Sequence, residues 1–291
     1  MHSMLLKNPA LRAPIIKKPI TVTENTLLLE ALEILQKFRI SRLVVIDRNS
    51  KPIGIITEKD ILRGLYPIGA KRLSSLQIND LMSKDLISVT KKESVYQCAK
   101  LMKDNGISSL VVLNESGSLE GILTKTDLVF NFLSQETSPL PISKIMTKKV
   151  VTVDSGDPLF LVESTLINNK ISRVPVLKNQ KLVGIITHRD FIPTKMPNRL
   201  GTFPEPQEFK DVWFNPRPNQ FNVNRLSYVL TFRAEDIMTK NPVTIRAQDD
   251  VSLAALIMYR YDISGIPVVK QSKLNGIITK SDIVFALAKE V

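Results

Sequence analysis

Four short segments of the chain share residue types that could bind a polar ligand. Each has a glycine, two aliphatic residues, a threonine, and an aspartate three positions after the threonine; the Thr/Asp pairs are Thr57/Asp60, Thr124/Asp127, Thr187/Asp190 and Thr279/Asp282. A carboxylate at the start of a helix can accept hydrogen bonds from both vicinal hydroxyls of a ribose. The backbone amides at the same helix N-terminus favour an anion. The four turns are therefore candidate sites for a ligand with a ribose and a phosphate.

The same Thr-x-x-Asp pattern is also a helix cap, in which Thr accepts from the third helical amide and the acid accepts from the Thr amide. Capping accounts for threonine at all four positions. It accounts less well for aspartate at all four, because glutamate or glutamine is the usual capping-box partner. We expect a cap in every copy and a ribose contact at two or more of the aspartates.

Further hydroxyl and basic residues recur at fixed distances from these turns. A hydroxyl residue lies in a short β-branched run 38 or 39 positions before each aspartate, at Thr21, Ser88, Thr152 and Thr244. An Ile-Ser pair follows 20 positions later, and the residue after its serine is Arg42 or Arg173 in the first and third copies. Those two copies also place a basic residue, Lys59 or Arg189, directly before the aspartate. Arginine binds phosphate with its planar fork and lysine as a point charge, so we predict phosphate contacts at these four residues; solvated strand ends are the alternative for the arginines.

The elements that position these residues form a repeat with a period of roughly 60 residues. Each copy predicts a strand, an amphipathic helix, two strands joined by a turn, and a second helix that begins after the threonine. One such β-α-β-β-α unit is too small to bury a good core, so we expect the units to pair. Cys98 falls in the same helical column as Ala31 and is predicted to be a small core residue rather than a reactive thiol.

Composition limits the class of protein. The chain has 291 residues with 43% hydrophobic and 23% charged residues, which is typical of a globular protein. We see neither a membrane-spanning run nor a signal peptide, and a single cysteine indicates a reducing, cytoplasmic setting. The net charge of +12 favours anionic partners such as nucleotide phosphates, nucleic acid, an acidic protein or a membrane surface, although a solvated lysine-rich surface explains it equally well.

The repeat is interrupted before its last copy. The anchoring aspartates are 67, 63 and then 92 residues apart, and the added residues contain six prolines, the only tryptophan and the run Phe203, Phe209, Trp213, Phe214 and Phe221. Such aromatic content does not suit a flexible linker. We expect this insertion to be ordered and to cover a module face, a cleft or a second copy of the chain.

Taken together, these motifs resemble the cystathionine-β-synthase (CBS) repeat, and stand-alone prokaryotic or archaeal CBS-domain proteins in particular. Three lead-in motifs support the resemblance: Asp80-Leu81-Met82-Ser83, Lys144-Ile145-Met146-Thr147 and Asp236-Ile237-Met238-Thr239. The first repeat departs from this motif. The resemblance implies an α/β fold in which four β-α-β-β-α repeats pair through their sheets into two Bateman modules. It places repeat one at 12–70, repeat two at 78–135, repeat three at 141–192, the insertion at 193–233 and repeat four at 234–291.

The resemblance also implies a ligand. Clefts between paired CBS repeats commonly bind AMP, ADP, ATP or S-adenosylmethionine. In the family the Asp of Thr-x-x-Asp holds the ribose hydroxyls, the Thr lies near ribose and phosphate, and the first-strand hydroxyl residue helps to hold the base. By this correspondence Thr21, Ser88, Thr152 and Thr244 lie on the base side.

The sequence contains no recognisable catalytic constellation, metal-ligand cluster or phosphate loop. We therefore predict a regulatory adenine-nucleotide sensor without enzymatic activity. Its partners would be an adenosine-containing small molecule together with a second copy of the chain, or an enzyme or transporter that it regulates. A nucleic-acid-binding protein that uses the basic surface and the insertion is the main alternative. A structural subunit with empty clefts is the third.

Overall fold

The structure, a computed structural model, describes residues 16–64, 75–133, 139–191 and 232–288. Repeat one contains β1 (Thr21–Thr23), α1 (Leu28–Lys37), β2 (Arg42–Ile46), β3 (Pro52–Thr57) and α2 (Glu58–Gly64). Repeat two contains η2 (Ile78–Asp80), β4 (Ser88–Val89), α4 (Val95–Asp104), β5 (Ser109–Leu113), β6 (Leu119–Thr124) and α5 (Lys125–Leu133). Repeat three contains η3 (Ile142–Lys144), β7 (Val153–Asp154), α6 (Leu159–Asn168), β8 (Arg173–Lys178), β9 (Lys181–Thr187) and η4 (His188–Phe191). Repeat four contains α9 (Ala234–Ile237), β10 (Thr239–Lys240), α10 (Val251–Arg260), β11 (Gly265–Lys270), β12 (Lys273–Thr279) and α11 (Lys280–Leu287).

The predicted fold of repeated β-α-β-β-α units is confirmed, with local departures in repeats three and four. Each repeat has a small sheet, and β10 of repeat four joins the sheet of repeat three. In repeats one to three the first strand runs parallel to the second, which forms an antiparallel hairpin with the third. Repeat four differs, because its predicted first strand is reduced to a single parallel bridge between Ile245 and Val268. Repeat three differs at its end, where the described residues after Thr187 form the 3₁₀ helix η4 rather than an α-helix.

The first helix of each repeat is amphipathic, as its spacing of apolar residues predicts. Its buried face is Leu28, Ala31, Leu32 and Leu35 in α1, and Val95, Cys98, Ala99 and Met102 in α4. Cys98 is fully buried, and burial raises the pKa of its thiol to about 12, so the prediction of an inert core cysteine is confirmed. In α6 Glu163 is also buried beside Leu159, Val162 and Leu166.

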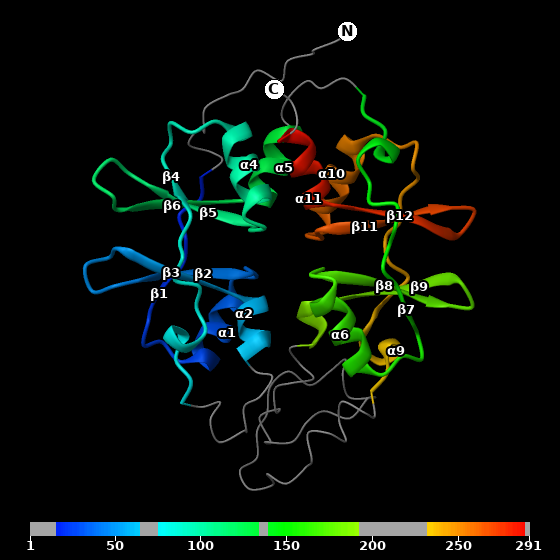
Figure 1. Cartoon of the computed structure of the whole chain (residues 1–291), viewed down its shortest axis with the longest axis horizontal. Coiled ribbons are helices and arrows are strands. Elements are labelled where there is room, and N and C mark those ends of the chain that lie inside the picture. Colours follow the sequence, from blue (N-terminus) through cyan, green and yellow to red (C-terminus); the bar gives the residue numbers. More distant parts are fainter. Residues whose placement is uncertain (1–15, 65–74, 134–138, 192–231, 289–291) are drawn as a thin grey trace, which may run out of the picture.

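The four repeats lie as quadrants of a flat assembly (Figure 1). Repeats one and two form one module and repeats three and four the other, with the sheets of each pair facing one another. Within each module the repeats exchange their lead-in segments, since Ser83 pairs with Ile55 of repeat one and Lys17 pairs with Ile122 of repeat two. Gly54 permits this crossing, because a Cβ at this position would lie 2.6 Å from the Met82 sulfur.

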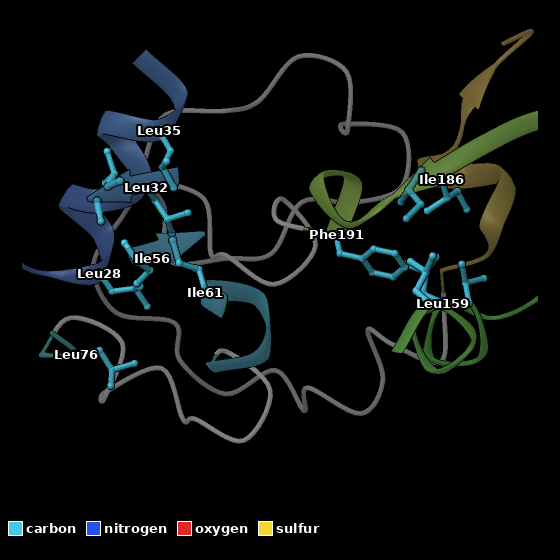
Figure 2. Close-up of a cluster of buried hydrophobic side chains, with 14 of the residues drawn as sticks. Leu28, Leu32, Leu35, Ile56, Ile61, Leu76, Leu159, Ile186 and Phe191 are labelled. Carbon is cyan, nitrogen blue, oxygen red and sulfur yellow. The ribbon is translucent and has the colours of Figure 1, made fainter. Parts of the chain in front are cut away.

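The two modules meet through their helices. Helices α4 and α5 pack against α10 and α11, and α2 contacts η4. Buried apolar side chains accordingly form two clusters. One joins repeats one and three with the lead-in residues of repeats two and four, and the other joins repeats two and four with the lead-in residue Ile142 of repeat three. Figure 2 shows the first cluster, in which Leu28, Leu32 and Leu35 of α1 gather near Ile56 and Ile61 while Phe191 points toward Leu159 and Ile186. The hydrophobic core therefore continues from one module into the other.

The insertion that the sequence places at 193–233 lies outside the described residues except at its end. Phe203, Phe209, Trp213, Phe214 and Phe221 all belong to the part that is not described. At the end, Phe232 is 1% exposed in the first cluster, and its carbonyl accepts a 3.0 Å hydrogen bond from the Leu159 amide. The chain thus returns to repeat three before repeat four begins.

Candidate functional site

The Thr-x-x-Asp turns have the same internal geometry in all four repeats. In each, the Oδ2 atom of Asp accepts from the Thr amide at 2.6–2.9 Å and from the Thr hydroxyl at 2.5–2.8 Å. In repeats one, two and four the Asp amide also donates to the Thr hydroxyl oxygen, at 3.3–3.4 Å. The capping prediction is confirmed, and capping occupies only one of the two carboxylate oxygens.

The second oxygen, Oδ1, distinguishes the repeats. Asp127 Oδ1 lies 2.7 Å from the ammonium nitrogen of Lys17, and Asp282 Oδ1 accepts a 3.1 Å hydrogen bond from the Thr147 hydroxyl. Among the described residues, nothing donates a hydrogen bond to Oδ1 of Asp60 or Asp190. Burial raises the pKa of Asp190, an effect that the hydrogen bonds from Thr187 oppose. Within the described part of the chain, Asp60 and Asp190 of the odd repeats therefore each have one carboxylate oxygen without a hydrogen-bond donor.

Strand pairing brings the predicted phosphate residues next to these turns. The residue after the second-strand serine lies directly opposite the turn threonine in every hairpin: Arg42 opposite Thr57, Ser109 opposite Thr124, Arg173 opposite Thr187 and Gly265 opposite Thr279. Both arginines then cross to the paired repeat of their module. Arg42 donates from Nη1 to the Ser108 carbonyl at 2.7 Å and from Nη2 to the Ser41 hydroxyl at 3.0 Å.

Arg173 lies against Gly265 of repeat four, where a Cβ would come within 2.2 Å of its Nη1 atom. Its Nη2 atom donates to the Ser172 hydroxyl at 3.2 Å, whereas its Nε and Nη1 atoms are buried without a hydrogen-bond partner among the described residues. Burial lowers the pKa of Arg173 to about 10, with Asp282 opposing the decrease, so the guanidinium remains charged at neutral pH. A cation with two buried nitrogen atoms whose N–H groups are unused within the described part of the chain is suited to receive an anion.

Two lysines that the sequence analysis did not select join the arginines. Lys125 and Lys280 follow the turn threonines of repeats two and four, and each donates across the module boundary: Lys125 to the Ser281 hydroxyl and Lys280 to the Thr126 hydroxyl, both at 3.0 Å. Burial lowers the pKa of each ammonium to about 8, and the positive charges of Arg42 and Arg173 contribute to both decreases. Arg42, Arg173, Lys125 and Lys280 together form a group of mutually repelling cations, named here the central cation cluster.

The remaining predicted phosphate residues lie in a different arrangement. Arg189 forms an ion pair with Glu58 across the boundary between repeats three and one, with Nε 3.1 Å from Oε1. Lys59 also makes a contact in the structure. The alternation seen in the sequence had assigned phosphate binding to the odd repeats alone. The structure places Lys125 and Lys280 of the even repeats near the two arginines, and the odd repeats have Glu58 and His188 at the corresponding position. The positive charge of the residue directly after the turn threonine is the sequence feature that could have identified Lys125 and Lys280.

The predicted base-side residues lie on or beside the first strands. Thr21 begins β1 and Ser88 begins β4, whereas Thr152 and Thr244 directly precede β7 and the Ile245 bridge. Thr21, Ser88 and Thr244 are exposed and Thr152 is half-buried. Their contact with a base stays a prediction. In the described parts of the chain, no cluster of metal-ligating side chains is found, nor any helix of the length and apolarity that crossing a membrane requires.

Comparison with known proteins shows the family. The family model of the CBS domain matches residues 14–66, 78–134, 142–194 and 234–289. The protein MJ1225 of Methanocaldococcus jannaschii is 25% identical over 283 residues, which cover 92% of this chain and 94% of MJ1225. Its crystal structure, described as that of a proposed archaeal homologue of γ-AMPK, aligns with a TM-score of 0.78 over 94% of this chain and 99% of MJ1225, at 24% identity.

Two other proteins are similar to the chain. A conserved protein of Pyrococcus horikoshii aligns with a TM-score of 0.61 at 21% identity over 93% of this chain and 96% of its own, which extends the shared fold to all four repeats. YlbB of Bacillus subtilis is 34% identical over 129 residues, corresponding to 43% of this chain and 87% of YlbB. The latter match has the size of a single two-repeat module.

Proposed function

Because the chain belongs to the CBS-domain family, we propose that it is a regulatory sensor of a phosphorylated adenosine ligand, AMP, ADP or ATP, with no catalytic activity of its own. The ribose would bind at Oδ1 of the free turn aspartates, and the phosphate would reach the central cation cluster. The base would lie against the first-strand residues Thr21, Ser88, Thr152 and Thr244. Lys59 and Arg189, which directly precede the turn aspartates of the odd repeats, would also contribute to phosphate binding.

One observation carries this proposal: the Nε and Nη1 atoms of Arg173 are buried, and their N–H groups have no hydrogen-bond partner among the described residues. Leaving buried donors unpaired is costly, so a protein that holds them in place is stabilised when an acceptor arrives. Lys125 and Lys280 add positive charge beside it, and burial, together with the charges of Arg42 and Arg173, lowers the pKa of both ammonium groups. An anionic ligand would relieve both conditions.

The cluster also favours one class of adenosine ligand over another. S-adenosylmethionine carries a sulfonium cation next to its ribose, and a group of partly buried cations repels such a charge. AMP, ADP and ATP place a phosphate at the corresponding position. We therefore propose the nucleotides as ligands ahead of S-adenosylmethionine.

Calorimetric titration with AMP, ADP, ATP, adenosine and S-adenosylmethionine tests the proposal. We expect AMP to bind roughly 10-fold or more tightly than adenosine, because one charge-assisted hydrogen bond contributes about 1.5–3 kcal/mol. Asp190→Asn keeps the size of the side chain but replaces one oxygen by a donor, and we expect it to weaken AMP and adenosine equally. Equal affinities of the wild type for adenosine and AMP would refute the phosphate assignment.

Nucleic-acid binding is the alternative that the net charge of +12 favours. Its affinity would fall steeply and linearly with the logarithm of salt concentration, because binding releases counterions from several phosphates. We expect AMP binding to show a much shallower salt dependence. Steep dependence with an oligonucleotide, together with no heat from any nucleotide, would favour the alternative, and no binding in either series would favour a structural subunit.

A further inference from the structure

Lys17 stands where the other three lead-in segments have a hydroxyl residue. Its backbone pairs with Ile122 of repeat two through two hydrogen bonds of 3.2 and 2.9 Å. Ser83 pairs with Ile55, Thr147 with Ile277 and Thr239 with Ile185 in the same antiparallel manner. The side chains of Lys17, Ser83, Thr147 and Thr239 are therefore equivalent in position. Each is attached to the backbone next to a Thr-x-x-Asp turn of the paired repeat.

The Lys17 side chain reaches into the turn of repeat two. Its ammonium nitrogen lies 2.7 Å from Oδ1 of Asp127, whose side chain is 3% exposed, while the Lys17 side chain itself is 65% exposed. The other carboxylate oxygen of Asp127 already accepts from Thr124. Both oxygens of Asp127 are consequently occupied by the chain itself, and Arg42 faces the same carboxylate.

We propose that Lys17 occupies the ribose position at Asp127 and closes the cleft of repeat two to nucleosides. The inference rests on the proposed function, since it concerns which of the four turns accept an adenosine ligand. A ribose hydroxyl is a neutral donor. To occupy this position it would have to displace the Lys17 ammonium from the buried carboxylate of Asp127. Separating those opposite charges deprives Oδ1 of the buried carboxylate of its ammonium partner, a loss that the weaker hydroxyl bonds do not compensate.

The turn of repeat four shows why the charge of Lys17 matters. Thr147 also contacts Oδ1 of its paired aspartate, Asp282, at 3.1 Å. This contact is a single neutral hydroxyl bond on a rotatable side chain, and a carboxylate oxygen can accept a second hydrogen bond. A ligand can therefore share Asp282 with Thr147, or replace it, without separating opposite charges. Repeat two alone among the four described turns has a lysine in this position.

The number of ligands bound per chain tests the proposal. Equilibrium dialysis and calorimetry with AMP, and separately with adenosine, would count sites in the wild type and in Lys17→Thr, which introduces the residue found at 147 and 239. Lys18→Thr removes the same charge from the exposed neighbouring residue and is the matched control. We expect Lys17→Thr to bind one more ligand per chain than the wild type, and Lys18→Thr to bind the same number.

The reciprocal variant Ser83→Lys places an ammonium opposite Asp60, and we expect it to bind one ligand fewer than the wild type. This variant retains the Lys17–Asp127 ion pair, so it remains informative if Lys17→Thr fails to fold. Wild-type binding with site numbers unchanged in both variants would overturn the inference while leaving the sensor function intact. A wild type that binds neither AMP nor adenosine would overturn the sensor function and the inference with it.

Discussion

Replacing Arg173 by methionine separates the role of this residue in binding from its cost to the folded protein. Methionine has a similar length and no charge, so it can fill the space over Gly265 without burying unpaired donors. In the wild type only Nη2 has a hydrogen-bond partner, Ser172, among the described residues, while Nε and Nη1 have none. The ligand-free variant is therefore expected to be more stable than the wild type, and its binding of phosphate weaker.

The expected changes in the free energy of unfolding and in the affinity for AMP follow from removing the unpaired donors and the positive charge of Arg173. Replacing buried ionic groups by apolar residues of similar volume often stabilises a protein by about 1–4 kcal/mol. The attraction between Arg173 and Asp282 is lost at the same time, so we expect a net gain of about 1–2 kcal/mol in the free energy of unfolding. Loss of a charge-assisted bond to phosphate costs about 1.5–3 kcal/mol, which corresponds to a roughly 10- to 150-fold weaker affinity for AMP.

Urea denaturation without nucleotide and calorimetry with AMP and adenosine measure the two effects. Arg42→Met is the matched control, because the Nη1 atom of Arg42 donates to the Ser108 carbonyl at 2.7 Å and this carbonyl would lose its partner. We expect Arg42→Met to weaken AMP binding without stabilising the free protein. If Arg173→Met destabilises the free protein, or if its affinity for AMP equals that of the wild type, the reasoning from unpaired donors is refuted.

Two other expected outcomes concern the lysines and the core. Because the pKa values of Lys125 and Lys280 are lowered to about 8, the unfolded chain holds more protons than the folded one above pH 8; their contribution to the free energy of unfolding therefore rises between about pH 8 and 10.5. A phosphate would restore the protons, so AMP binding near pH 8 should take up protons, measurable as a buffer-dependent calorimetric enthalpy that Lys125→Met reduces. In the core, Leu35 is 1% exposed, and Leu35→Ala should lower the free energy of unfolding, measured by urea denaturation, by about 2–5 kcal/mol. The control Leu256→Ala, at a residue that is 51% exposed, should change it by less than about 0.5 kcal/mol. Similar losses in both variants would contradict the assigned core.

The repeated architecture follows from local features of the sequence. Two features of the first helices were predicted correctly, because each depends only on neighbours within one helix. They are the amphipathic spacing, seen in α1 at Leu28, Ala31, Leu32 and Leu35, and the equivalent helical position of Ala31 and Cys98. The Thr-x-x-Asp caps are likewise local, because their hydrogen bonds join residues three positions apart. Local geometry of this kind is set by side-chain chemistry and backbone periodicity, which can be read along the chain.

The sequence also overestimated the regularity of the repeats. The strand predicted around Thr244 is a single bridge at Ile245, and the described residues after Thr187, where a helix was predicted, form the 3₁₀ helix η4. Identical motifs do not guarantee identical elements, because the ends of strands and helices depend on the residues packed against them.

Only the assembly of the repeats makes the surroundings of the four similar turns differ. Lys17 reaches Asp127 from another repeat, Arg173 lies on Gly265, and Lys125 meets Ser281 across the module boundary. Such contacts join residues about 90 to 160 positions apart, and their separation along the chain carries no signal of their proximity. The availability of a carboxylate oxygen or a guanidinium donor depends on what occupies it in space, so chemically identical turns become different sites only when the repeats assemble.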